Sequence, residues 1–511
     1  MGSDINRRII GMIINGDINS RSQLQKVKVK MAGEYGLNAV PSNSEILADA
    51  HDDELRTIIP MLQRKPVRTI SGVAVVAVMT SPHPCPHGKC TYCPGGVDNG
   101  SPQSYTGKEP AARRALRNEF DPFRQVSDRI NQLEAIGHRT DKIDLIIMGG
   151  TFTSRDPQYQ EWFVRRCFDA MNGKDSKSMD EAHALNTVSA HRCIGMTVET
   201  RPDVFGDEEI ERTMALGATR AEIGVQILDD DILRDVNRGH GTKEIIDATG
   251  RCKRHGLKVC YHVMPGLPGS SAEKDIVSFK RMFEDPGMRP DMLKIYPTLV
   301  IPGTELHDRW LSGGYVPYND EQGTELISQM KLLVPEYIRI QRIQRDIPVQ
   351  QIAAGIMKSN LRELAQRRLS EQGKGCRCIR CREVGQNDIS LDDPSAIVLN
   401  DMRYEASGGT EHFVSLEYDD MIIGYVRLRT DGDIASIREL KVFGRMAAIG
   451  EQGEDWQHRG FGKQLMARAE EIAASAHARE IRITSGVGVR RYYASLGYEL
   501  RGPYMVKEIS G

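Results

Sequence analysis

Three cysteines stand close together in the segment CPHGKCTYCPGG: Cys85, Cys90 and Cys93, with four and then two residues between them. Thiols at this density are typical of a metal or iron–sulfur site. A structural zinc ion normally takes four protein ligands, and His83 or His87 could supply the fourth. Three thiolates also suit a [4Fe–4S] cluster, because they leave one iron open to a cofactor or substrate. The loop alone is compatible with both a zinc site and an iron–sulfur cluster.

A second group of thiols has spacings of one and two residues: Cys376, Cys378 and Cys381. It lies in a polar segment rich in Lys and Arg, which favours a zinc site in a linker over a second redox cluster. The sequence does not reveal a fourth ligand. The other cysteines are isolated in apolar segments, which is typical of small buried side chains in a reducing compartment; they are Cys167, Cys193, Cys252 and Cys260.

A glycine-rich segment, QHRGFG, opens a strongly amphipathic helical pattern near the carboxy terminus. The first peptide N–H groups of a helix, together with its dipole, favour a bound phosphate. By itself such a turn is weak support, because a plain helix cap has a similar composition. The candidate ligand-binding residues here are Gln457, Arg459, Gly460, Phe461, Gly462 and Lys463.

Composition sets the frame for these sites. The chain has 511 residues, more than one hydrophobic core usually serves, so two or three domains are expected. The net charge is only −2, but residues 1–30 hold six basic and two acidic side chains, and residues 355–382 hold eight and two. Each cluster could contact RNA or form a solvated face. No apolar run reaches the roughly 18 residues of a membrane span, so a soluble, cytoplasmic protein is expected.

The elements that position the first group of thiols are predicted between residues 66 and 350. Short apolar runs at 72–79, 143–150, 193–200, 220–226, 257–266 and 292–296 alternate with helical patterns. This alternation predicts parallel strands and a partial or complete β/α barrel of the TIM type. A further strand with a basic edge is predicted within 335–350. Loops after the strands share one face of such a barrel, and these would carry the Cys loop, Gly149, Gly150, Glu199, Lys294 and Tyr296.

The pattern becomes antiparallel from about residue 396. Alternation on both sides of Asp419 and Asp420 predicts a hairpin, which is followed by a strand at 434–444, the amphipathic helix, another strand and a short helix. At the other end, residues 42–62 are predicted to form one helix capped by Ser42 or Ser44. The expected organisation is a helical basic region at 1–65, the α/β barrel at 66–350, a basic zinc-binding linker at 351–395 and an α+β domain at 396–511.

The Cys loop follows the first of a series of parallel strands, and Tyr92 precedes its last cysteine. In this it resembles the radical S-adenosylmethionine superfamily. The resemblance implies that the three thiolates hold a [4Fe–4S] cluster whose open iron binds S-adenosylmethionine. It also implies cofactor contacts from Gly149 and Gly150, and a polar contact from Glu199 unless that residue is a structural salt-bridge partner. The sequence departs from the commonest pattern by one extra residue between the first two cysteines and by Thr151 in place of an acid.

The order of strand, glycine-rich helix start, strand and YYASLGY resembles the acetyltransferase family that binds acetyl-coenzyme A. Gln457, Gly460 and Gly462 match its motif. The resemblance implies that Tyr492 or Tyr493 acts as general acid toward the departing thiolate, a role that a lowered pKa would favour. Because neighbouring residues of a helix point in different directions, the other tyrosine is expected to pack in the core.

Taken together with the strings LKIYPTLVIPGTEL, RIQRDIP and CRCIRCRE, the chain resembles the family of the catalytic subunit of Elongator, in a stand-alone archaeal or bacterial form. The resemblance implies modification of the transfer RNA wobble uridine at carbon 5 and a zinc site in the linker. A deoxyadenosyl radical would take hydrogen from the methyl of acetyl-coenzyme A, the carbon radical would add to the base, and thioester hydrolysis would leave a carboxymethyl group.

The expected partners follow from this function. They are the anticodon loop of transfer RNA, an electron donor of unknown identity and a second copy of the chain in a homodimer, with no membrane. Lys294 and Tyr296, a cation and an aromatic ring at a strand end, would hold the flipped uridine. Two alternatives remain open: a protein lysine acetyltransferase with a structural cluster, and an RNA-binding scaffold that has lost catalysis.

Overall fold

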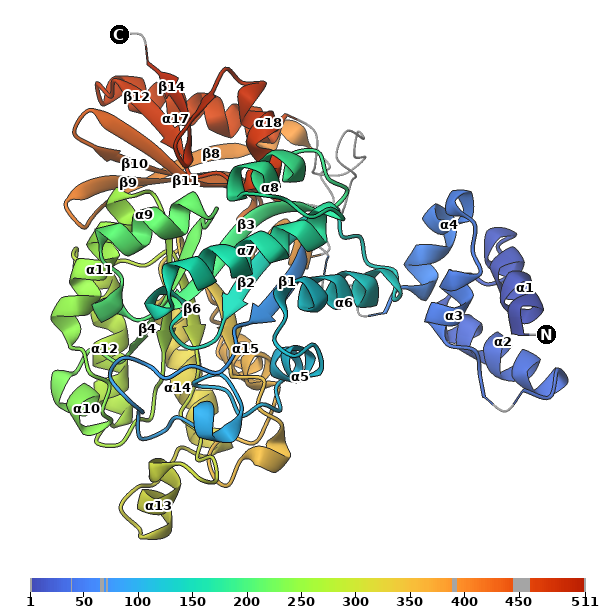
Figure 1. Cartoon of the computed structure of the whole chain (residues 1–511), viewed down its shortest axis with the longest axis horizontal. Helices are drawn as coiled ribbons and strands as arrows, with labels where there is room; N and C mark the ends of the chain where they lie inside the picture. The colour runs from blue at the N-terminus through green and yellow to red at the C-terminus, as the bar shows by residue number, and fades with distance from the viewer. Residues whose placement is uncertain are drawn as a thin grey trace.

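Two sheets and a separate group of helices make up the chain (Figure 1). The computed structural model describes residues 2–37, 39–64, 69, 72–387, 393–443 and 460–509. The predicted mixed α/β architecture with a helical amino-terminal region is confirmed. Within the described residues, no helix is both long and apolar enough to cross a membrane.

The first sheet has seven parallel strands in sequential order. The strands are β1 (Ala74–Met79), β2 (Lys142–Met148), β3 (Arg192–Thr200), β4 (Arg220–Gln226), β5 (Lys258–Val263), β6 (Met292–Ile295) and β7 (Arg339–Ile343). In the described chain β1 and β7 do not pair, so the sheet is an open half-barrel. This decides between the partial and complete barrels that the sequence allowed, and β7 is the strand predicted within 335–350.

Helices connect these strands and cover the sheet, and two more follow β7. Two of them begin with proline directly after an aspartate cap, at Asp121 and Pro122 and at Asp156 and Pro157. Proline suits the first helical position, and the carboxylate accepts free peptide N–H groups. The helices are α5 (Pro110–Arg117), α6 (Pro122–Glu134), α7 (Pro157–Asn172), α8 (Met179–Asn186), α9 (Asp207–Ala215), α10 (Asp230–Asp235), α11 (Thr242–Arg254), α12 (Ala272–Glu284), α13 (Glu305–Leu311), α14 (Asp320–Leu333), α15 (Leu361–Glu371) and α16 (Ile379–Arg382).

The second sheet has the order β13-β14-β12-β11-β10-β9-β8 and is antiparallel except for the β11–β12 pair. The predicted hairpin joins β9 to β10 through Asp419 and Asp420, whose φ angles of 48° and 64° match a type I′ turn. The strand β8 was not predicted. The elements are β8 (Val398–Ala406), β9 (Gly409–Tyr418), β10 (Met421–Asp431), β11 (Ile434–Val442), α17 (Phe461–Ser475), β12 (Glu480–Ile483), α18 (Arg490–Ala494), β13 (Glu499–Arg501) and β14 (Tyr504–Glu508).

The amino-terminal helices have their own small apolar core (Figure 1, right). The prediction of one helix over 42–62 was wrong, because two helices occupy this stretch. Ser42 and Glu45 form a capping box at the first, and the His51 N–H donates to Glu54 at 2.8 Å, which starts the second. The helices are α1 (Gly2–Ile14), α2 (Arg21–Glu34), α3 (Asn43–Ala48) and α4 (Asp52–Leu62).

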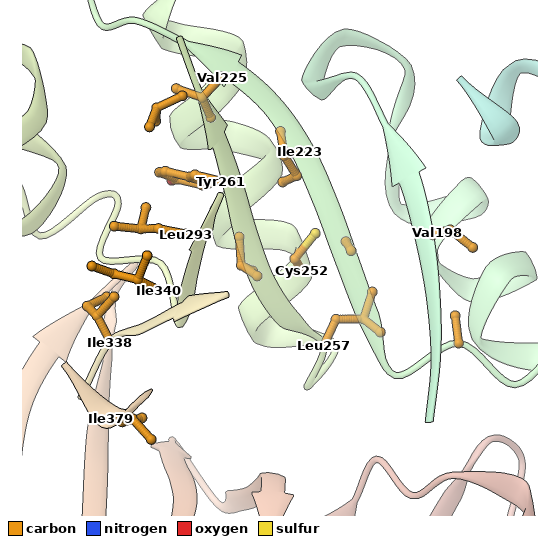
Figure 2. Close-up of a cluster of buried hydrophobic side chains, with 14 of the residues drawn as sticks. Val198, Ile223, Val225, Cys252, Leu257, Tyr261, Leu293, Ile338, Ile340 and Ile379 are labelled. Atoms are coloured by element: carbon orange, nitrogen blue, oxygen red, sulfur yellow. The ribbon is translucent and has the colours of Figure 1, made fainter. Parts of the chain in front are cut away.

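The two sheets share one continuous apolar core. Figure 2 shows part of it, running from Val198 on β3 through Tyr261 and Leu293 to Ile338 and Ile379 near the second sheet. Burial of these side chains is the main favourable term that holds the two sheets together, since it removes a large apolar area from water.

A buried ionic network also joins the sheets. Arg438 on β11 donates to both carboxylate oxygens of Asp291 at 2.6 Å and to Glu411 at 2.6 Å. Lys253 on α11 lies 3.3 Å from Glu411, and all four side chains are at most 1% exposed. Arg427 lies 3.6 Å from Asp291 and Arg429 lies 3.4 Å from Glu411, so buried cations surround both carboxylates. Pairing of this kind is the condition for burying charge at tolerable cost.

A glycine-rich loop of the second domain lies directly against β3. A Cβ on Gly486 would come within 2.1 Å of the Ile194 carbonyl oxygen, and one on Gly488 within 2.6 Å of the Arg192 side chain. Only glycine permits this approach of two backbones. The same strand ends at Thr200, so β3 connects this contact with the face of the half-barrel that carries the Cys loop.

Candidate functional site

A cavity of about 710 Å³ opens at the carboxyl ends of the half-barrel strands. Parallel β/α folds place their ligands at this edge because the loops after the strands converge there. Most of the predicted barrel residues line it. They are Cys85, Gly150, Glu199, Lys294 and Tyr296.

The Cys loop lies beside this cavity with its thiols largely enclosed. Cys90 and Cys93 are 5% and 3% exposed, and Cys85 is half-buried. The Cys93 sulfur accepts from the Ser104 peptide N–H and from the Gln103 amide, both at 3.2 Å. Donors aimed at sulfur stabilise a thiolate and tune a bound cluster.

The separation of the three thiols fits a cluster better than a single zinc ion. Thiolates on one tetrahedral zinc lie about 3.8 Å apart, because Zn–S bonds are about 2.3 Å long. In the described part of the chain, Cys85, Cys90 and Cys93 do not form a group with all sulfurs within 4.8 Å of one another. The His87 Nε2 atom lies 3.2 Å from the Cys90 sulfur, but neither Cys85 nor Cys93 completes a compact group with these two atoms. The wider triangle suits thiolates that each bind a different iron.

The residues predicted to contact S-adenosylmethionine lie next to the thiols. Gly149 and Gly150 have φ angles of 137° and 87°, and a Cβ on Gly149 would come within 2.1 Å of the Thr80 hydroxyl. Glu199 forms no ion pair among the described residues; its carboxylate accepts from the Tyr105 hydroxyl at 2.8 and 3.0 Å. Thr151, where an acid was expected, lies 3.5 Å from the Cys85 sulfur.

Arg238 is a site residue that the sequence analysis missed. It is 7% exposed, lies 3.7 Å from the Cys90 sulfur and donates to the Gly224 carbonyl at 2.8 Å. Burial, together with the charges of Arg201 and Arg238, lowers the pKa of His87 to about 4. His87 is therefore neutral near pH 7, and Arg238 supplies the positive charge beside the thiols. The motif NRGH after β4 carries Arg238, but no spacing rule pointed to it.

The lining also holds a group of four residues, of which the sequence predicts two. Lys294 and Tyr296 were expected at a strand end, and they meet Glu222 of β4 and His262 of β5. Burial opposes ionisation of Glu222, but Lys294 and His262 hold its pKa below the ordinary value. Burial likewise opposes the charge of Lys294, yet Glu222 raises its pKa. Glu222 and His262 occupy inward positions of predicted strands, which is the signal that could have identified them.

The candidate acetyl-coenzyme A residues are described in part. Gln457 and Arg459 lie outside the described residues. Gly460, with a φ of 85°, precedes α17, and Phe461, Gly462 and Lys463 form its first turn. Three free peptide N–H groups at such a turn can bind phosphate.

The two tyrosines near this helix start differ in exposure. Tyr492 is 37% exposed, and its hydroxyl would lie 3.2 Å from a Cβ on Gly462. Tyr493 is 7% exposed and packs against Tyr498. Burial raises the pKa of Tyr492, whereas the sequence analysis expects a lowered pKa for a general acid. A raised pKa keeps the phenol protonated, which a proton donor requires at the start of a reaction.

The second cysteine group is compact. The sulfurs of Cys376, Cys378 and Cys381 all lie within 4.8 Å of one another, and Cys378 is fully buried. This spacing fits one zinc ion, as predicted. Among the described residues no His, Asp, Glu or further Cys completes the group, while the Lys331 ammonium lies 3.7 Å from the Cys381 sulfur.

Some basic side chains in the region predicted to bind RNA form ion pairs within the protein. Arg382 is 3% exposed and is paired with Glu336, Glu417 and Asp420, while Arg368 is paired with Glu321 and Glu325. In the amino-terminal region Lys28 is 5% exposed. The basic side chains of 355–382 with no ion pair in the described chain are Lys358, Arg362, Arg367, Lys374 and Arg380.

Comparison with known proteins covers nearly the whole chain. Family models match as the ELP3 N-terminal domain at residues 3–70, the Radical SAM superfamily at 81–279, the Radical_SAM C-terminal domain at 290–371 and the Acetyltransferase (GNAT) family at 382–498. The tRNA uridine(34) acetyltransferase of Methanocaldococcus infernus is 48% identical over 523 residues, which cover 98% of each chain. Elongator complex protein 3 of Homo sapiens is 42% identical, covering 98% of this chain and 96% of that protein. A solved structure of archaeal Methanocaldococcus infernus Elp3, lacking residues 1–46, has a TM-score of 0.76 at 46% identity and covers 86% of this chain and 100% of that one.

Proposed function

Since the chain belongs to the Elongator complex protein 3 family and carries radical S-adenosylmethionine and GNAT acetyltransferase domains, we propose that it carboxymethylates the wobble uridine of transfer RNA at carbon 5 with acetyl-coenzyme A as carbon donor. The observation that carries the proposal is the cavity itself. Cys85 of the Cys loop lines it, and so do the buried Lys294 ammonium and the Tyr296 ring. A base held by Lys294 and Tyr296 would share the cavity with Cys85.

The residues have distinct tasks in this proposal. Cys85, Cys90 and Cys93 would hold a [4Fe–4S] cluster, and the backbone at Gly149 and Gly150 would approach S-adenosylmethionine closely. When bound, these cofactors supply a 5′-deoxyadenosyl radical, and acetyl-coenzyme A supplies the two-carbon unit. Enclosure of the thiols by the surrounding loops excludes water, which would otherwise quench reactive species.

Other side chains bind and move protons. Lys294 and Tyr296 hold the flipped uridine, with the ammonium fixed by Glu222. Tyr492 donates a proton to the coenzyme A thiolate when the thioester is cleaved. The unpaired basic side chains Lys358, Arg367 and Lys374 contact RNA phosphates, while the zinc-binding cysteines fix the linker that carries these side chains.

The test is product analysis with the full chain. Protein reconstituted anaerobically with iron and sulfide receives a reductant, both cofactors and transfer RNA, and its nucleosides are analysed by mass spectrometry. We expect 5-carboxymethyluridine at the wobble position, its loss in Cys90→Ala and its retention in the control Cys167→Ala, whose sulfur is buried away from the site.

Two other outcomes would point elsewhere. Protein acetylation that survives Cys90→Ala, without a modified nucleoside, would support a lysine acetyltransferase with a structural cluster. Salt-dependent transfer RNA binding without any 5′-deoxyadenosine would support an RNA-binding scaffold.

A further inference from the structure

The floor of the cavity beneath the proposed base site contains the carboxylate of Glu222, which binds one side chain from each of two neighbouring strands. His262 on β5 donates from Nε2 to the Glu222 Oε2 atom at 2.8 Å, and the Lys294 ammonium binds the same oxygen. The side chains of Glu222, Lys294 and His262 are 0%, 10% and 16% exposed, respectively. The carboxylate is therefore the deepest group, and the ammonium and imidazole lie above it.

The sheet register places the upper two groups at one level. His262 pairs with Lys294 across β5 and β6, and with Gly224 across β4 and β5. Directly paired residues of adjacent strands have side chains on the same face of the sheet. Lys294 and His262 thus form a pair that faces a ligand together, fixed from below by Glu222.

This group is not a metal site. Ligand atoms of Glu222, Cys260 and His262 lie within 4.8 Å of one another, which by itself would suit a cation. The Lys294 ammonium already occupies Oε2 of the carboxylate and supplies the positive charge. Burial also raises the pKa of the Cys260 thiol, which keeps it protonated and a poor ligand.

After their contacts with Glu222, His262 and Lys294 keep a defined set of hydrogen-bonding groups for a ligand. An ionised carboxylate only accepts hydrogen bonds, so the His262 Nε2 atom bonded to Glu222 carries the hydrogen. In a neutral imidazole Nδ1 is then an acceptor, and it has no hydrogen-bond partner among the residues that the structure describes. Lys294 has three N–H donors, of which Glu222 takes one. The pair offers a ligand one donor group beside one acceptor.

We propose that Lys294 and His262 read the Watson–Crick edge of uracil and that Glu222 is the residue that positions both. The inference rests on the proposed function, because it assumes that a wobble base enters this cavity. The uracil O4 accepts from the Lys294 Nζ atom, and its N3–H donates to the His262 Nδ1 atom. Both uracil groups are adjacent on the ring, as the donor and acceptor are in the protein.

Cytosine presents the opposite pattern on the same edge. Its N4 amino group would face the ammonium, donor against donor, and its bare N3 would face the Nδ1 lone pair. A site built to pair with hydrogen-bonding groups rejects a ligand that leaves buried polar groups unpaired. The pair therefore selects uridine over cytidine at the wobble position.

The arrangement also leaves carbon 5 free. This carbon lies outside the Watson–Crick edge, so an edge held by β5 and β6 does not cover it. The Tyr296 ring, which meets the His262 ring edge to face at 5.5 Å between centroids, lies beside the bound base. The base can then present carbon 5 to the part of the cavity lined by Cys85.

The test measures binding, which does not depend on turnover. Full-length, cluster-reconstituted protein without reductant is titrated, at one fixed salt concentration, into two labelled anticodon stem–loop RNAs that differ only in U or C at the wobble position. Fluorescence anisotropy gives the two dissociation constants. We expect the wild-type protein to bind the U form about tenfold more tightly, in the range of one specific base contact.

Two substitutions of His262 separate the roles of its nitrogens. A Gln side chain can reach the Nε2 position and keep the donor to Glu222 but lacks the acceptor at Nδ1, so H262Q is expected to bind both RNAs equally. An Asn side chain places its amide near the Nδ1 position, so H262N is expected to retain part of the preference. H255Q makes the same change at a histidine paired with Asp207 outside the cavity and should preserve the full tenfold ratio.

Several results would overturn the inference. They are an unchanged U-to-C ratio in folded H262Q, equal binding of both RNAs by the wild-type protein, and a 4-thiouridine at the wobble position that crosslinks outside 257–266 and 292–296. Failure of the proposed function is distinguishable, because it appears as absence of 5-carboxymethyluridine from the fully supplied wild-type enzyme, whatever the binding ratio is.

Discussion

Tyr492 and Tyr493 show how two adjacent and chemically identical side chains receive different tasks. The sequence places both at the position of a general acid and cannot separate them. Tyr492 lies beside Gly462 at the start of α17 and is partly exposed, whereas Tyr493 is buried against Tyr498. The orientation of α18 on the sheet decides between them, and Tyr492 is the candidate donor.

This assignment predicts the effect of removing each hydroxyl. Tyr492→Phe should lower the rate of acetyl-coenzyme A cleavage by about 100-fold, because general acid catalysis contributes roughly that factor or more. Tyr493→Phe should stay close to the wild-type rate. Release of free coenzyme A thiol, followed with a thiol reagent, measures both. Equal losses in the two variants would contradict the assignment.

The half-barrel cavity likewise combines residues that the sequence predicts with residues that only the structure identifies. Lys294 and Tyr296 could be predicted because they end an apolar strand and differ from it in chemistry. Glu222 and His262 lie inside strands 220–226 and 257–266, where a polar residue looks like an ordinary interruption of an apolar run. Only the pairing of β4, β5 and β6 brings His262 and Lys294 to the same carboxylate oxygen of Glu222.

At the scale of elements, β3 connects the two domains. Its first residues contact the backbone at Gly486 and Gly488, and its last ones reach the cavity. The predicted domain boundaries at 66, 351 and 396 stay a proposal, and they describe segments of sequence that the shared core joins in space.

The close approach at Gly486 predicts a position-specific cost. Gly486→Ala should lower the free energy of unfolding by about 1–3 kcal/mol, the usual cost of inserting a methyl group where no space exists. Gly385→Ala is the control, since nothing lies within 4 Å of a Cβ there. Denaturant unfolding followed by circular dichroism measures both. A Gly486→Ala protein as stable as the control would show that the backbones can separate without cost.

The linker carries a second prediction at this scale. If Cys376, Cys378 and Cys381 hold zinc, native mass spectrometry should find one zinc per chain and Cys378→Ala should lose it. The control Cys167→Ala should keep it, because that buried thiol lies elsewhere. Zinc loss should also lower stability, since metal binding free energy contributes to folding. Retention of zinc by Cys378→Ala would contradict the assignment.

At the scale of the whole molecule, the stability of the protein depends on the ionic network at the interface of the two sheets. Asp291 and Glu411 are buried and pair with Arg438 and Lys253, and also with Arg427 and Arg429, respectively. Removing one partner of a buried pair is expensive, because the other charge stays in a medium of low dielectric. Arg438→Met should therefore destabilise the protein by about 3–5 kcal/mol. The exposed pair of Arg501 and Glu508 offers a control, and Arg501→Met should cost less than about 1 kcal/mol.

The same network predicts a pH dependence. Burial alone would raise the pKa of Asp291 and of Glu411, but Arg438 and Lys253 hold both below the ordinary values of 3.8 and 4.5. A carboxyl with a lowered folded pKa contributes stability above its ordinary pKa and loses it as the pH falls through the folded value. These two groups should therefore still stabilise the wild-type protein at about pH 4.

Arg438→Met should shift this acid sensitivity upward, because both pKa values rise when the guanidinium is removed. Unfolding midpoints measured between about pH 3 and pH 7 should fall at a higher pH in Arg438→Met than in wild type. Parallel curves for the two proteins would show that Arg438 does not control the ionisation of Asp291 and Glu411.

The sequence by itself determined which chemistries are present and in what order. Cysteine spacing, strand periodicity and the glycine-rich helix start depend on local rules that act over fewer than about 20 residues. These rules correctly predict β1 to β7 and the β9–β10 hairpin. The tertiary structure decided what is set by contacts between distant segments: the open edge of the half-barrel, the separation of the Cys85 loop thiols, the role of Arg382 as a buried ion-pair partner and the meeting of Glu222, His262 and Lys294. Such contacts follow from strand order and packing, which no local pattern encodes.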